Sequence, residues 1–215
     1  MRCLALLLLF AATPLSAETL EVCFIGNAAV QITDGRVTLI SDFPYKSGAF
    51  GYMEYSWEKV QPKGEVLSLI THKHDDHFEA ALLAKTNWKV MAPPDAAAKV
   101  PSVRLVPIKD HAEFQGIQIN AFATPHAKVD HYSYLVTWHG KRLYFTGDTE
   151  STDQLLVQRN LDSVFVTPWL IDTVLSKNKR IDARHWIVYH HTSAEKVPAN
   201  CANCKLPKQG ECWEF

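Results

Sequence analysis

The segment Val66–Phe78, VLSLITHKHDDHF, limits the possible folds of this chain most strongly, because a short apolar run leads directly into a cluster of metal-binding side chains. His72, His74, Asp76 and His77 lie within six residues. Imidazole and carboxylate groups are common zinc ligands, and a short apolar run before them is typical of a buried strand. The segment therefore predicts a strand whose end supplies half of a two-metal site.

The spacing within this cluster allows one segment to serve two ions. Alternate side chains of an extended segment point the same way, so His72 and His74 can converge on one ion. The turn that follows redirects Asp76 and His77 toward a second ion. A four-coordinate metal then needs further ligands from distant segments.

Further candidate ligands stand at the ends of other strand-like runs. His126, Asp148 and the adjacent pair His190 and His191 each follow such a run, and Gly147 lets the backbone turn tightly before Asp148. Neighbouring residues at a strand end face opposite sides. We therefore expect one of the two adjacent histidines to be a ligand and favour His190.

The rest of the chain is dominated by predicted strands, and 47% of all residues are hydrophobic, which is enough for one substantial core. A chain dominated by strands, with a few helices inserted between them, favours two packed sheets with the helices on the outside. The expected strands are Leu20–Ile25, Ala28–Thr33, Val37–Ser41, Val66–Ile70, Lys89–Ala92, Val103–Pro107, Ile117–Thr124, Tyr132–Trp138, Arg142–Thr146, Ser163–Thr167 and, last, Trp186–Tyr189. The expected helices are Glu79–Lys85, Pro94–Lys99 and Ser151–Asn160.

Residues 1–17 have the features of a secretory signal peptide. Arg2 precedes the apolar run Cys3–Ala12, and the small residues Ser16 and Ala17 follow it, which predicts cleavage after Ala17. The run is too short for the roughly twenty residues that span a bilayer. We therefore expect a secreted or periplasmic protein with no membrane span once the signal is removed.

Export changes how the cysteines are interpreted, because disulfides persist in oxidising compartments. Cys23, Cys201, Cys204 and Cys212 remain after signal cleavage, and four cysteines allow three pairings. The spacing of Cys201 and Cys204 also suits half a zinc knuckle or a redox pair. We favour a C-terminal tail, residues 196–215, that is closed by disulfides. Cys23, outside this tail, is either the cysteine that anchors it or a buried free thiol.

The formal net charge is −1, and the chain has no run of basic residues. A surface for nucleic acid or membrane headgroups is therefore not indicated. The expected partner is a small-molecule substrate, and the sequence does not address the oligomeric state.

The cluster HKHDDH matches the H-x-H-x-D-H signature of the metallo-β-lactamase superfamily. Tyr144–Thr149, YFTGDT, is similar to the second metal motif of that superfamily, and the resemblance extends over residues 20–192. The opening Phe24–Asn27, followed by Asp42-Phe43-Pro44, resembles the branch with the ascorbate-6-phosphate lactonase relatives.

This resemblance implies an α+β fold, a four-layer αββα sandwich over residues 18–195, with two zinc ions at one edge; iron or manganese would suit the same ligands. The ligands would be His72, His74 and His126 for one ion and Asp76, His77 and His190 for the other, with Asp148 bridging. Water or hydroxide lies between the ions in that family. Asp76 would orient this nucleophile and help to protonate the leaving group.

The functional expectation is a secreted zinc-dependent hydrolase that cleaves an ester, lactone, amide or phosphodiester bond. Two alternatives remain: a non-catalytic metal-binding or scaffold protein, and an iron-containing redox or oxygen-handling protein. His131 is a candidate for lining the pocket, or for replacing His126, and Asp42 is assigned no direct metal role. The aromatic loop Lys46–Trp57 and Trp169 are candidate pocket walls.

Overall fold

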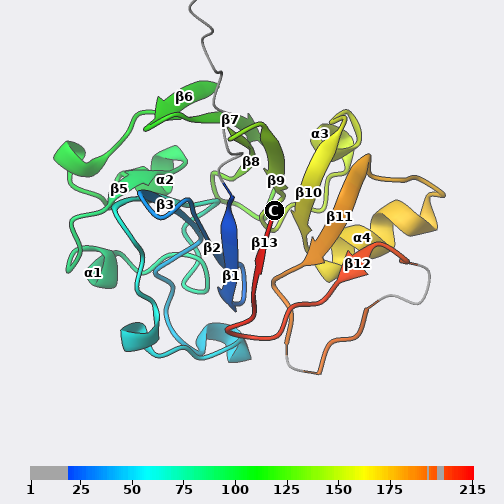
Figure 1. Ribbon diagram of the computed structural model, residues 1–215, viewed down its shortest axis with the longest axis horizontal. Helices are drawn as coiled ribbons and strands as arrows, with labels where there is room; N and C mark the ends of the chain where they lie inside the picture. The colour runs from blue at the N-terminus through cyan, green and yellow to red at the C-terminus, as the bar shows by residue number, and fades with distance from the viewer. Residues whose placement is uncertain (1–18, 193, 198–200) are drawn as a thin grey trace, which may run out of the picture.

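The computed structural model describes residues 19–192, 194–197 and 201–215. The predicted signal peptide lies outside the described residues. Within them, two mixed β-sheets pack face to face (Figure 1). Their strand orders are β13-β1-β2-β3-β4-β5 and β12-β11-β10-β9-β8-β7-β6.

The first sheet begins as an antiparallel meander and continues with parallel pairs. Along β1, buried and partly exposed residues alternate, as expected for a strand that packs one face against the core. Its strands are β1 (Glu21–Gly26), β2 (Ala29–Thr33), β3 (Val37–Ser41), β4 (Glu65–Leu69), β5 (Lys89–Met91) and β13 (Cys212–Glu214).

The second sheet is antiparallel from β6 to β9 and parallel from β9 to β12. Parallel strands need crossover connections, and short helices lie in those from β9 to β10 and from β10 to β11. The strands are β6 (His111–Phe114), β7 (Ile117–Ala123), β8 (Tyr132–Trp138), β9 (Lys141–Phe145), β10 (Leu161–Val166), β11 (Ala183–Val188) and β12 (Cys204–Lys205).

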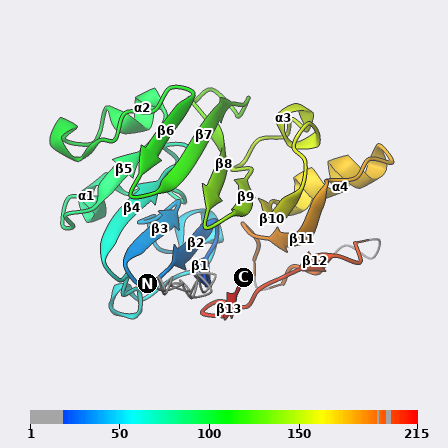
Figure 2. The same cartoon turned by 45° about the horizontal axis from the view of Figure 1, so that its top comes forward.

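The helices cover the outer faces of the two sheets, as Figure 2 shows from a second direction. They are α1 (Ala80–Leu83), α2 (Pro94–Ala97), α3 (Asp153–Leu156) and α4 (Pro168–Ser176), with 3-10 turns η1 (Ala49–Gly51), η2 (Trp57–Lys59) and η3 (Ser102–Arg104). The central core combines Phe24 and Leu67 of the first sheet with Val136 and Phe145 of the second, all fully buried. Separate clusters lie under α1 and α2 and under α3 and α4. The predicted four-layer αββα sandwich is therefore confirmed.

Several predicted elements are wrong in detail. Val103–Pro107 is not a strand: η3 covers its start, and Leu105 makes one isolated bridge to Val90. Pro107 at the end of this stretch and Pro101, two residues before its start, have no backbone N–H to donate to a ladder. The strand β6 was not predicted, and neither was α4. Pro168, which directly follows the predicted strand Ser163–Thr167, occupies the first turn of α4, where its missing N–H costs nothing.

The C-terminal tail contributes an edge strand to each sheet, so Trp186–Tyr189 is not the last strand. β12 pairs with β11 and β13 pairs with β1. The disulfides join Cys23 to Cys212 and Cys201 to Cys204, which makes Cys23 the anchor of the tail and excludes a zinc knuckle in this oxidised form. Figure 2 shows the tail crossing beside both sheets.

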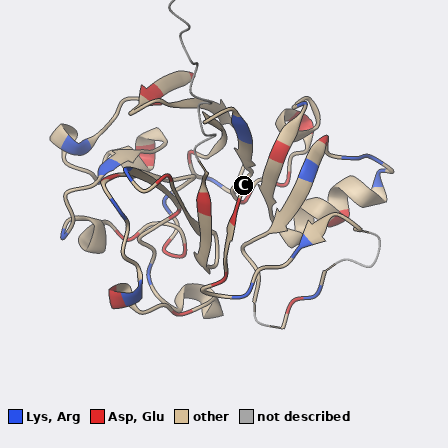
Figure 3. Ribbon diagram, viewed as in Figure 1, with Lys and Arg blue, Asp and Glu red and all other residues tan. Residues whose placement is uncertain are grey.

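The described surface carries no single dominant sign of charge. Figure 3 shows basic and acidic residues interspersed over both sheets and their loops. None of the described helices is long and apolar enough to cross a membrane.

Candidate metal centre

Seven histidine and aspartate side chains converge at the edge where strands of both sheets end, and they form two groups. We call the first group the trihistidine position: His72, His74 and His126. We call the second the mixed position: Asp76, His77, Asp148 and His190. The segment after β4 serves both groups, while segments after β7, β9 and β11 supply one residue each.

At the trihistidine position, the imidazole nitrogens face one another across short distances. His72 Nε2 lies 2.9 Å from His74 Nδ1, and His126 Nε2 lies 3.4 Å from the same atom. His72 is fully buried, whereas His74 and His126 are only partly buried. This group is therefore open to solvent on one side.

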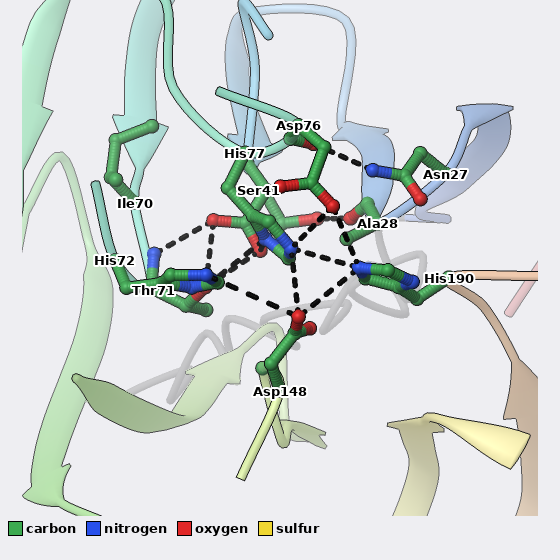
Figure 4. Close-up of polar contacts among 12 residues, drawn as sticks. Asn27, Ala28, Ser41, Ile70, Thr71, His72, Asp76, His77, Asp148 and His190 are labelled. Atoms are coloured by element: carbon green, nitrogen blue, oxygen red, sulfur yellow. Dashed lines mark hydrogen bonds and ion pairs between the residues drawn. The ribbon is translucent and has the colours of Figure 1, made fainter. Parts of the chain in front are cut away.

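At the mixed position, all four residues are buried. Figure 4 shows His190 directed at the other three. Its Nε2 lies 3.1 Å from Asp76 Oδ2, 3.0 Å from His77 Nε2 and 3.1 Å from Asp148 Oδ2. The same Asp148 oxygen lies 4.0 Å from His72 Nε2, which places this carboxylate between the two groups.

Gly147 allows the segment after β9 to pass close beside the centre. Its φ is +58°, and a Cβ there would overlap His131 Nε2 and crowd Thr71. Its N–H donates to the hydroxyl of Tyr189 at 2.6 Å. A larger residue at this position would displace Asp148.

His131 lies behind Asp148 and belongs to neither ligand group. Its Nε2 accepts the backbone N–H of Asp148 at 3.0 Å, and its Nδ1 lies 2.8 Å from the hydroxyl of Thr124. Because an N–H group must donate, His131 is the neutral tautomer with the proton on Nδ1. Burial lowers its pKa to about 3. The structure therefore places His126, not His131, among the candidate ligands.

Asp42 contacts His77 on the side away from Asp148 and His190. Its Oδ2 lies 3.1 Å from His77 Nδ1, and its carboxylate accepts the backbone N–H of Thr71 at 2.7 Å and the hydroxyl of Thr71. A carboxylate on the outer nitrogen of a ligand histidine sets its tautomer and ring orientation. From the sequence, Asp42 was given no direct metal role. Its position directly after β3 is the sequence feature from which this indirect role could have been predicted.

Electrostatics differ between the two positions. Burial alone would lower the pKa of His77, but the carboxylates of Asp148 and Asp42 outweigh burial and hold that pKa well above its usual value. The pKa of His190 is raised in the same way, because the carboxylate of Asp148 outweighs burial. Burial would raise the pKa of Asp148, yet these imidazoles hold it well below its usual range.

The histidines of the trihistidine position are shifted in the opposite direction. Burial lowers the pKa of His72 and, to a smaller extent, that of His126. Neutral imidazoles are the form that binds metal. This group is therefore ready to bind without losing protons from these two residues.

The residues fit two divalent cations. Imidazole nitrogens and carboxylate oxygens form a donor set that suits zinc, iron or manganese. Asp148 Oδ1 is buried and has no hydrogen-bond partner among the described residues, although a buried carboxylate oxygen normally has one. A cation would satisfy this oxygen.

Aromatic side chains form a wall beside the mixed position. The ring of Tyr52 meets His190 edge-on with centroids 4.3 Å apart, and Trp169 does so at 5.1 Å. The loop that carries Tyr52 is tied down where the backbone N–H of Lys46 donates to Asp75 O at 2.7 Å. The predicted loop and Trp169 thus border the site, although sequence reasoning did not single out Tyr52.

The remaining candidate at the end of β11, His191, faces away from both groups. Its ring stacks on Phe24, and its nitrogens lie 3.0 Å and 3.2 Å from the carbonyl oxygens of Thr192 and Pro207. His191 therefore contacts the tail, while its neighbour His190 points into the centre.

The fold and this two-position centre define a class of metal-binding α/β sandwich, and comparison with known proteins identifies the family. The family described as the beta-lactamase superfamily domain matches residues 21–180. The chain belongs to this superfamily, as its motifs indicated.

A curated relative agrees with this assignment. A hydroxyacylglutathione hydrolase from Rhodopseudomonas palustris is 37% identical over 84 residues, which cover 38% of this chain and 32% of that protein. The match thus spans about a third of the curated relative.

Two solved structures share the fold. A metallo hydrolase from Ignicoccus hospitalis has a TM-score of 0.67 at 17% identity, with 92% of this chain and 98% of that chain covered. The metallo-beta-lactamase fold protein YhfI from Bacillus subtilis has a TM-score of 0.65 at 15% identity, with 92% and 100% covered.

Proposed function

We propose that this protein is a zinc-dependent hydrolase that cleaves an ester, lactone, amide or phosphodiester bond of a small molecule. The observation that carries the proposal is the position of Asp148, whose carboxylate lies between the trihistidine position and the mixed position. Each position would hold one ion, and Asp148 would bridge them. Family membership supports this ligand assignment.

Two ions held there would lower the pKa of water and polarise the carbonyl or phosphoryl oxygen of the substrate. Asp76 is the candidate catalytic residue of the chain itself. Its carboxylate is buried at the centre, and the hydrogen bond from His190 helps to keep its pKa below the usual value despite burial. Asp76 would orient the attacking water, take up its proton and pass that proton to the leaving group.

Tyr52 and Trp169 would contact the substrate beside the ions. Aromatic rings bind apolar groups and stack on planar ones, so this wall suits a substrate with an apolar or planar portion. Phe50, two residues before Tyr52 in the same loop, is also exposed.

A hydrolysis screen tests the proposal. Zinc-loaded protein is assayed against chromogenic esters, lactones, lactams and phosphodiesters, with hydroxyacylglutathione included because the curated relative is named for it. We expect turnover of at least one class, lost in His72→Ala and Asp148→Ala together with bound zinc. Turnover by a folded, metal-free variant would refute the mechanism, and metal binding without any turnover would favour a non-catalytic role.

Metal identity is tested by elemental analysis of protein purified without added metal or chelator. We expect two zinc ions for each chain. Two iron ions would instead direct attention to redox chemistry, because the donor set suits both metals.

The proposal includes export, with residues 18–195 as the hydrolase domain and 196–215 as its tail. The disulfides Cys23–Cys212 and Cys201–Cys204 support it, because such bonds persist in oxidising compartments. Mass spectrometry of protein recovered from the periplasm or medium should find an N-terminus at Glu18. An uncleaved chain that remains in the cytoplasm would contradict this part of the proposal.

A further inference from the structure

Asn27, in the turn between β1 and β2, contacts two of the segments that supply the mixed position. The residue is fully buried. Its side-chain Nδ2 donates to the carbonyl oxygen of Asp76 at 2.6 Å, as Figure 4 shows. The backbone carbonyl oxygen of Asn27 accepts the backbone N–H of His190, also at 2.6 Å.

These two hydrogen bonds link segments from different sheets. Asp76 follows β4 of the first sheet, and His190 follows β11 of the second. The side chains of these two residues meet at 3.1 Å. Asn27 therefore fixes, from the backbone side, the distance between two candidate ligands that lie 114 positions apart.

We propose that Asn27 is a positioning residue for the mixed position and that it sets the affinity of this position for its ion. The inference rests on the metal centre of the proposed function. Partners outside the ligand shell typically change metal affinity by about 10- to 100-fold when they are removed. The side-chain amide of Asn27 holds the Asp76 segment against the turn whose backbone carbonyl holds His190, so loss of this amide should weaken the affinity within this range.

The effect should be selective. Among the described residues, Asn27 makes no hydrogen bond to His72, His74 or His126. His72 is supported instead by the hydroxyl of Thr71, 3.1 Å from its Nδ1. The trihistidine position should therefore keep its affinity when the amide of Asn27 is lost.

The backbone of Asn27 explains the residue type and supplies matched variants. Its φ is +53°, a left-handed conformation that glycine, asparagine and aspartate tolerate better than other residues. Asn27→Gly keeps this conformation and the carbonyl that accepts from His190, and removes only the amide. Asn27→Asp keeps the shape but places an acceptor oxygen opposite the carbonyl of Asp76.

The test measures zinc binding at each position separately by calorimetry on metal-free protein. His74→Ala disables the trihistidine position, and His190→Ala disables the mixed position. In the His74→Ala background, Asn27→Gly and Asn27→Asp should weaken zinc binding by about 10- to 100-fold. In the His190→Ala background, the same changes should alter zinc binding by less than about twofold.

Asn178→Gly is the matched control, because Asn178 also has a positive φ, +51°, but is exposed in the turn after α4. It should leave both affinities unchanged. Circular dichroism of each metal-free variant verifies folding. Equal losses in both backgrounds, or no loss in either, would overturn the proposal, and neither outcome depends on finding a substrate because the readout is metal binding.

Discussion

The trihistidine position and the mixed position differ in charge, burial and support. The first uses three imidazoles, two of them only partly buried, whereas the second uses two carboxylates and two imidazoles that are all buried. Asn27, Asp42 and His131 hold the residues of the mixed position from outside. Negative charge and pre-organised ligands both favour cation binding, so we expect the mixed position to bind its ion more tightly.

The largest effect is expected where the two positions meet. Asp148→Ala removes the carboxylate that lies against both groups and leaves His77 and His190 without their main anionic partner. Both ions should be lost, whereas His74→Ala should lose one. Elemental analysis after dialysis measures the ratio of zinc to protein, and retention of both ions in Asp148→Ala would remove the basis for a bridging role.

The next effect is the pH dependence of the two affinities. In metal-free protein, the pKa of His77 is held well above its usual value and that of His190 is raised, so both imidazoles keep their protons to a higher pH than an ordinary histidine does. An ion must displace these protons, so affinity at the mixed position should rise with pH by about tenfold per unit for each proton released. This rise ends once the pH exceeds the two pKa values.

The trihistidine position should show a weaker pH dependence, because the lowered pKa values of His72 and His126 leave both imidazoles neutral. Calorimetry in buffers of different ionisation enthalpy counts the protons released by each position, with His74→Ala and His190→Ala used to isolate them. Equal proton release from both positions would contradict the comparison.

A smaller loss is expected from Asp42→Asn. The variant weakens the contact that orients His77, and affinity at the mixed position should fall by about 10-fold or more. The trihistidine position should be unaffected. Asp34→Asn is the control, because Asp34 also pairs with an imidazole, His139 Nε2 at 3.0 Å, but in a hairpin region away from the centre. If both variants bind zinc equally well, Asp42 does not position His77.

The smallest effect is expected at the exposed edge of the site. Lys46 Nζ lies 3.6 Å from Asp75 Oδ2, and both side chains are more than half exposed. An exposed pair of this kind contributes about 0–1 kcal/mol, and the backbone bond from Lys46 to Asp75 survives substitution. Lys46→Ala should change the free energy of unfolding, measured in urea, by less than about 1 kcal/mol and leave zinc affinity unchanged. A large loss of zinc affinity would show that surface charge supports the site.

Local sequence predicted the elements and candidate ligands that depend on neighbouring residues. The apolar run before His72 predicted β4 nearly to its bounds, and the predicted strands Val37–Ser41 and Tyr132–Trp138 match β3 and β8 at both ends. The predicted strand Val103–Pro107 was wrong because apolar composition does not account for the missing backbone N–H groups of Pro101 and Pro107. The helix α4 was missed because a proline can either end a strand or start a helix.

Contacts between distant segments could not be predicted in this way. Cys23 had several possible partners, and only the pairing of β1 with β13 brings Cys212 next to it. Asn27 resembled an ordinary turn residue, because its two partners lie 49 and 163 positions away in the sequence. No local sequence pattern predicts a contact between residues so far apart in the chain.

The sequence by itself determined the ligand types, the superfamily and the division of the cluster after β4 between two groups, because these depend on residue identity and on the alternation of an extended chain. Tertiary structure decided that His190 enters the centre while His191 contacts the tail, and that His131 supports Asp148 instead of joining the candidate ligands. The physical reason is that a side chain's direction at a strand end is set by what packs against it. For these residues the neighbours are strands of both sheets.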